Sequence, residues 1–173
     1  IFKYMKDVHN MATGEVNIII LVVFLCGALG ALIFGRLGDL WYKKNKRAKV
    51  ILALICNGLP IFFMLIFINT DFWIPDKTPF LSMLDIPGVP IMIAAVAGAV
   101  FINQGVNPNW YSTLTDVNLP EHRGTIVSLA SVMDLLGHAL GPLLASYIAS
   151  RWGLYTAMRS VIFFWDIGSR PEE

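Results

Sequence analysis

Charged residues are scarce in this sequence. Only 14% of its 173 residues are Asp, Glu, Lys or Arg, whereas soluble domains carry about 25%. Hydrophobic residues make up 56%, so the chain is too apolar for an ordinary soluble domain of this size. Its formal net charge of +1 provides no overall positive field, and no nucleic-acid partner is expected.

Cysteine and cofactor motifs are scarce as well. Cys26 and Cys56 both lie within apolar runs and lack metal-ligand spacing, so we interpret them as small hydrophobic residues. The Walker, dinucleotide-binding, zincin and serine-hydrolase patterns are all missing from the sequence. We therefore expect no bound nucleotide, no metal and no other cofactor.

Long apolar runs are what the chain does contain. A helix needs about 20 residues to cross the hydrocarbon core of a bilayer, and several runs reach that length without a charge. They are continuous rather than alternating, which favours helices over barrel strands. Core helices of a soluble protein are the alternative, but so many runs would leave almost no polar surface. We predict an all-α, polytopic membrane helix bundle, a single membrane domain over 1–173, with helices over approximately 17–35, 50–70, 89–116 and 125–150 and a partial helix over 153–168.

A dense basic cluster separates the first two runs. Residues 35–49 read GRLGDLWYKKNKRAK, and six of these fifteen residues are Lys or Arg. Short loops rich in Lys and Arg stay on the cytoplasmic side of a membrane. We therefore expect this loop and the later LPEHRGT loop on the cytoplasmic side and the loop over 71–88 on the outer side. We also expect the protein to lie in the cell membrane, in contact with its lipid.

The stretch GRLGDLWYKKNK resembles motif A of the major facilitator superfamily of transporters, G-x-L-A-D-R-x-G-R-R, which joins the second and third helices of each six-helix half. The matching residues are Gly35, Leu37, Asp39, Lys43 and Lys44, whereas Gly38, Leu40 and Tyr42 depart from the pattern. The resemblance implies that Asp39 contacts the inner end of a neighbouring helix and helps to hold the outward-facing state. A solvated Asp within an ordinary cytoplasmic basic cluster is the alternative.

A second stretch, LPEHRGTIVSLASVMDLLGHALGPLLASYIA, resembles the fifth helix of a half. There, a P-x-x-R-G loop leads into a helix that carries G-x-x-x-G-P, and the matching residues here are Pro120, Arg123, Gly124, Gly137, Gly141 and Pro142. Two predicted crossings separate the two motifs, as in the superfamily. The resemblance implies a partial six-helix half of the superfamily fold. We interpret the chain as a fragment of the C-terminal half, whose motif A tends to be degenerate, and expect the remaining helices of the transporter as partners.

Small residues recur one turn apart on two predicted helices. They are Gly27, Ala31 and Gly35 on the first, and Gly137 and Gly141, followed by Pro142, on the fourth. Small residues at this spacing allow helix backbones to approach closely, so we predict packing faces there. Kinks are expected at Pro142 and, within the predicted helix over 89–116, at Pro108.

Polar residues inside the predicted spans are candidates for function. Asp134 and His138 lie one turn apart, so their side chains can touch, and a charge at membrane depth costs at least about 2.5–3.5 kcal/mol. They either carry protons or form a static pair that anchors helices. Asn103, Gln104 and Asn107 either hydrogen-bond neighbouring helices or line a substrate path.

Two classes of function follow. The first is a secondary active transporter or facilitator that moves a small solute by alternating access, with proton coupling as an option. The second is a membrane-embedded enzyme that uses Asp134 and His138. The sequence supplies no third histidine or carboxylate at that depth, so we expect a transporter and not an enzyme; nothing in the sequence selects the solute.

Overall fold

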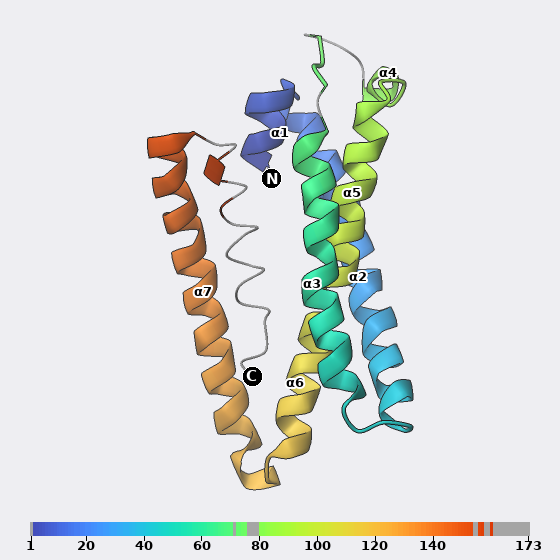
Figure 1. Cartoon of the computed structure of the whole chain (residues 1–173), viewed down its shortest axis with the longest axis vertical. Helices are drawn as coiled ribbons and strands as arrows, with labels where there is room; N and C mark the ends of the chain where they lie inside the picture. Colours follow the sequence, from blue (N-terminus) through green and yellow to red (C-terminus); the bar gives the residue numbers. More distant parts are fainter. Residues whose placement is uncertain (1, 71, 76–79, 154–155, 158–159, 161–173) are drawn as a thin grey trace.

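The computed structural model describes residues 2–70, 72–75, 80–153, 156–157 and 160 (Figure 1). Within these residues the fold is entirely helical, which confirms the predicted all-α class. The elements are α1 (Phe2–His9), α2 (Thr13–Tyr42), α3 (Ala48–Asn69), α4 (Phe80–Met83), α5 (Gly88–Asn103), α6 (Val106–Val117), the 3-10 turn η1 (Pro120–His122) and α7 (Arg123–Trp152).

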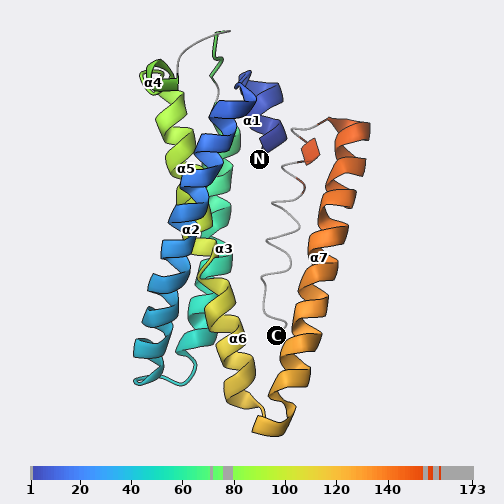
Figure 2. The same ribbon diagram turned by 180° about the vertical axis from the view of Figure 1, so that it is seen from behind.

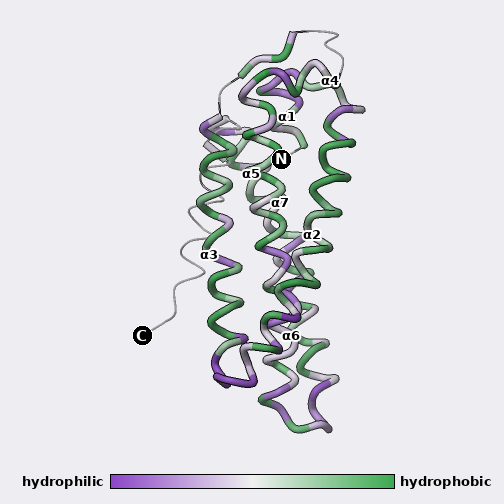
Figure 3. Tube along the Cα trace, turned by 90° about the vertical axis from the view of Figure 1, so that its right-hand side faces the viewer, coloured by the Kyte–Doolittle hydropathy of each residue, from purple (hydrophilic) through white to green (hydrophobic). Residues whose placement is uncertain are grey.

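Among the described residues, four helical stretches are long and apolar enough to cross a membrane, as predicted. They cover Thr13–Tyr42, Ala48–Asn69, Gly88–Val117 and Pro120–Trp152. Hydrophobic residues run along these helices, while hydrophilic residues gather near the turns that join them (Figure 3). Many large apolar side chains point outward from the bundle, which suits contact with lipid. The chain is therefore an integral, multi-pass membrane protein.

The first long helix extends beyond the predicted range of 17–35 at both ends. It begins at Thr13, where the backbone N–H of Ala12 donates to a carboxylate oxygen of Glu15 at 3.0 Å. It continues through the first part of the basic cluster to Tyr42, so Asp39 lies in a helix rather than in a loop. No proline interrupts residues 36–42, and thirty helical residues exceed the length needed for the hydrocarbon core, so the helix ends reach the polar interface.

The third membrane helix is interrupted in its middle. It was predicted as one helix over 89–116 with a kink at Pro108, and it consists of α5 and α6 on either side of Gln104 and Gly105. Pro108 has no N–H for the carbonyl of Gln104, and its ring crowds that carbonyl. Gly105 is buried, and a Cβ placed there would lie 2.6 Å from Phe34 and 2.8 Å from Cys56. At the break, the backbone of Gly105 therefore packs closely against Phe34 of α2 and Cys56 of α3.

The core forms where α5 packs between α2 and α3 (Figures 1 and 2). A Cβ added at Gly27 would lie 2.9 Å from Val100, and one added at Gly30 would overlap the carbonyl oxygen of Phe101. Only glycine permits such a close approach of two backbones. Gly30 was not among the residues predicted to pack, although it shares the face of Gly27.

The helix α7 stands apart from this core. It joins the bundle through η1 and contacts α6, and none of its residues is buried. Its helical conformation continues through Pro142. A Cβ added at Gly137 or Gly141 would meet no atom within 4 Å, so their packing role stays a prediction. The predicted partial helix over 153–168 lies almost wholly outside the described residues.

Candidate functional site

A buried lysine organises the end of the bundle that carries the basic loop. Lys49 is the second residue of α3 and is 7% exposed. Its Nζ atom lies 3.3 Å from Oδ1 of Asp39 on α2 and 2.8 Å from Oδ2 of Asp116 on α6. It also donates to Oγ of Ser112 at 2.6 Å. We call these four residues the charge network; it links α2, α3 and α6 at one point.

The geometry of the charge network satisfies the hydrogen-bond donors of the Lys49 ammonium group. An ammonium has three N–H donors, and the network offers one oxygen to each of them. The ring of Tyr42 adds a face 4.5 Å from the Nζ atom, a distance at which a cation and an aromatic ring attract each other. The carboxylates differ in exposure, since the side chain of Asp39 is 70% exposed and that of Asp116 is 34% exposed. The network thus carries a net negative charge, and Asp39 keeps much of its surface free.

The sequence analysis missed both Lys49 and Asp116 as functional residues. Lys49 was counted only as one of six cytoplasmic cations, and Asp116 only as the end of a helix. A signal existed, because Asp116 is a lone carboxylate at the end of a charge-free run and falls at the same predicted membrane edge as the basic loop. The pairing itself joins residues 67 positions apart, so no local pattern shows it.

Asn109 is a second buried polar residue that sequence reasoning missed. Its Nδ2 donates to the carbonyl oxygens of Phe34 at 3.1 Å and Gly105 at 2.8 Å. A Cβ added at Gly38 would overlap its side-chain oxygen. Asn109 therefore fixes α6 against α2 one turn below the interruption, and Gly38 provides the space for it.

The three predicted polar residues around the interruption take different positions. Gln104 packs against α2, because a Cβ added at Gly27 would lie 3.1 Å from the Cγ of Gln104. Asn103 is half-buried at the end of α5, and Asn107 is exposed on α6. Only Asn107 lines a cavity, so the structure separates these residues rather than gathering them.

Asp134 and His138 lie within reach of each other, as their spacing predicts. Oδ1 of Asp134 and Nε2 of His138 are 3.7 Å apart on successive turns of α7. Their side chains are 55% and 77% exposed, so the pair is accessible within the described structure rather than enclosed by it.

A cavity of about 320 Å³ lies between α3, α6 and α7 and includes Asp134 in its lining. Half of its ten lining residues are aliphatic. The other lining residues are Asn57 on α3, Asn107, Trp110 and Tyr111 on α6, and Asp134 on α7. One carboxylate, two amides and two aromatic rings therefore converge on an otherwise apolar space.

The remaining motif residues lie away from this cavity. Arg123 is exposed, and its Nε donates to the carbonyl oxygen of Asn118 at 3.3 Å, while a Cβ at Gly124 would meet no atom within 4 Å. Lys43 and Lys44 line a surface crevice beside Trp41. Gly35 packs against Pro108. Ala31 is half-buried on α2.

No group of three His, Cys, Asp or Glu side chains that could hold a metal ion occurs in the described part of the chain. The Asp134–His138 pair therefore has two possible ligands and no third among these residues.

Comparison with known proteins gave one match. The family model described as Major Facilitator Superfamily matches residues 1–167. No curated protein and no solved structure matches the chain.

Proposed function

Because this chain belongs to the major facilitator superfamily, a family of membrane transporters, we propose that it forms part of a secondary transporter that moves a small solute by alternating access. In this superfamily two six-helix halves rock around a central site. The four span-length helices supply part of one half, and the helices that complete the transporter are its expected partners. In the proposed orientation the basic loop faces the cytoplasm and the cell membrane is the location.

The observation that carries the mechanism is the Asp134–His138 pair beside the cavity. A carboxylate within a membrane-crossing helix is costly, so its retention favours a functional role. We propose that Asp134 binds a proton on one side of the membrane and releases it on the other, with His138 as the neighbouring proton acceptor. The solute then crosses in the same conformational cycle.

The charge network supports a conformational role for the motif around Asp39. Lys49 joins α2, α3 and α6 at the basic-loop end, so it links the motif around Asp39 to two other helices. The exposed surface of Asp39 remains able to contact the N-terminus of a helix from the other half, where a carboxylate gains about 0.3–1 kcal/mol from the helix dipole. This contact would close the cytoplasmic side in the outward-facing state.

The test compares uphill uptake with exchange in the complete transporter. Asp134→Asn keeps the shape and hydrogen bonding of the side chain but cannot titrate. We expect it to abolish proton-driven uphill uptake in proteoliposomes and to spare exchange of solute across the membrane. His138→Gln should weaken uphill uptake in the same direction, and Glu121→Gln, an exposed carboxylate on η1, is the matched control.

If uphill uptake survives in both Asp134→Asn and His138→Gln, the pair does not carry protons and serves as a static contact. If the complete wild-type protein moves no solute by either assay, the transport proposal itself is wrong.

A further inference from the structure

We propose that the cavity between α3, α6 and α7 binds a small organic cation, with the carboxylate of Asp134 as its counter-charge while that group carries no proton. The inference rests on the proposed transport function and adds to it the chemical class of the solute. Three properties of the cavity support it: the sign of its charge, its aromatic residues and its size.

The charge of the cavity lining is negative. Among the lining residues that the structure describes, Asp134 is the one carboxylic acid, and none is Lys, Arg or His. His138 lies 3.7 Å from Asp134 but outside the lining, and as a neutral imidazole it leaves the charge of the carboxylate uncompensated. Unlike charges attract each other, so a carboxylate in a lining without a described basic residue favours a cationic ligand over an anionic one.

The nearest basic residue does not cancel this charge. Lys49 precedes the lining residue Val50 on α3, but its ammonium binds Asp39, Asp116 and Ser112. Because two carboxylates accompany one ammonium, this neighbourhood also carries a net negative charge. A cation that enters the cavity therefore meets no unpaired positive group in the described structure.

The aromatic residues favour an organic cation over a neutral solute. Trp110 and Tyr111 both line the cavity from α6. The face of an aromatic ring attracts ammonium groups, and quaternary ammonium ligands are recognised in this way. The amides of Asn57 and Asn107 add hydrogen-bonding groups for a polar substituent of the ligand.

The size and lining of the cavity argue against an inorganic cation. Its volume of about 320 Å³ lies within the range of small-molecule sites, which is about 300–1,000 Å³. A bare metal cation instead needs about six oxygen ligands at short range, whereas half of this lining is aliphatic. The size and lining of the cavity therefore suit a solute that has both a cationic head and an apolar carbon portion.

The experiment uses three probes of similar shape and different charge: choline, its neutral analogue 3,3-dimethylbutan-1-ol, and the anion 3,3-dimethylbutanoate. Binding to the complete transporter in nanodiscs is measured by calorimetry. We expect choline to bind about tenfold more tightly than the alcohol, and the anion not to bind. Asp134→Asn should weaken choline binding about tenfold, and Trp110→Leu should weaken it less. Glu121→Gln should leave it unchanged. Unfolding temperatures without ligand show whether each variant is folded.

Equal binding of choline and the alcohol, preference for the anion, no binding of choline, or unchanged choline binding in folded Asp134→Asn would each overturn the assignment. A parallel uptake assay with labelled cationic, neutral and anionic solutes separates the two proposals. Transport of only neutral or anionic solutes would overturn the cation assignment and leave the transport function standing. Transport of none of them would overturn the transport function.

Discussion

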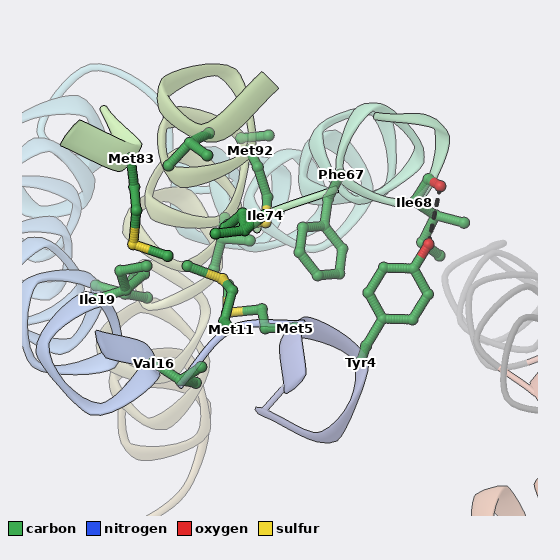
Figure 4. Close-up of a cluster of buried hydrophobic side chains, with 14 residues drawn as sticks. Tyr4, Met5, Met11, Val16, Ile19, Phe67, Ile68, Ile74, Met83 and Met92 are labelled. Atoms are coloured by element: carbon green, nitrogen blue, oxygen red, sulfur yellow. Dashed lines mark hydrogen bonds between the residues drawn. The ribbon is translucent and has the colours of Figure 1, made fainter. Parts of the chain in front are cut away.

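The two ends of the bundle are held together by different forces. At one end α1 packs on α2, α3 and the segment after α3 through a cluster of buried apolar side chains, including Met5, Met11, Ile19, Phe67, Ile68 and Met83 (Figure 4). Its polar contacts join side chains to backbone carbonyls: Tyr4 donates to the carbonyl of Ile68 at 3.1 Å, and Nδ1 of His9 lies 2.9 Å from the carbonyl oxygen of Phe72. At the other end, the charge network around Lys49 joins three helices.

This difference separates a fixed end from one that can rearrange. Apolar packing is short-ranged and has no simple alternative partner, so it favours one arrangement. An ammonium with two carboxylates can lose one contact and retain the other, and the exposed Asp39 is free to change partners. We infer that the α1 end maintains the bundle and that the charge network provides the part that switches. Four predictions test the contrast, from the largest expected loss of stability to the smallest.

Replacing Phe67 by alanine should have the largest effect. Phe67 is fully buried at the α1 end and its ring lies 5.2 Å from that of Tyr4. Removing such a side chain costs about 3 kcal/mol or more, measured as the free energy of unfolding of the detergent-solubilised protein. Phe62→Ala is the matched control, because Phe62 lies on the same helix and is exposed. Similar losses for the two variants would contradict the described core.

Lys49→Met should cost less, about 2 kcal/mol. Removing one member of a buried ion pair costs about 3–5 kcal/mol, but partial exposure of both carboxylates reduces this value. Lys46→Met tests the same substitution at an exposed position of the neighbouring loop and should have little effect on the free energy of unfolding. If Lys49→Met is as stable as Lys46→Met, the charge network does not hold the helices together.

Tyr4→Phe should cost about 1 kcal/mol, the usual net value of a hydrogen bond. The change removes the donor to the carbonyl of Ile68 and retains the ring in the core. Tyr147→Phe on α7 is the control, since Tyr147 is exposed. The unfolding temperature should fall only for Tyr4→Phe. An equal fall in both variants would show that the hydrogen bond from Tyr4 to Ile68 does not stabilise the fold.

Asp39→Asn should have the smallest effect on stability, about 0.5 kcal/mol or less, because exposed ion pairs contribute little. Transport by the complete protein should nevertheless be impaired at normal expression, since the proposed contact with the other half needs the carboxylate. Asp85→Asn, an exposed carboxylate beside α4, should preserve transport. Wild-type transport by Asp39→Asn would show that Asp39 has no conformational role and is a solvated residue of the basic cluster.

Local patterns anticipated the membrane helices better than the site. The spacing of Asp134 and His138 on one helix gave their 3.7 Å separation, because residues four apart on a helix are neighbours. Pro108 indicated a local distortion of the third helix, since its missing N–H acts within one turn, but the sequence predicted a kink in one helix rather than the observed interruption. The helical conformation of residues 36–42 was not anticipated, because polar and basic residues there suggested a loop.

For the described residues, the sequence by itself determined which four stretches are long and apolar enough to cross a membrane and roughly where they lie, because about 20 apolar residues are required for each crossing. Only the tertiary structure decided which faces meet. Lipid-facing and protein-facing positions are both apolar in a membrane, so hydropathy cannot distinguish Gly30, which contacts Phe101, from its neighbours. Two partners of Lys49, Ser112 and Asp116, lie 63 and 67 positions further along the chain. Their contact, and the cavity beside Asp134, exist only because the folded helices bring distant residues together.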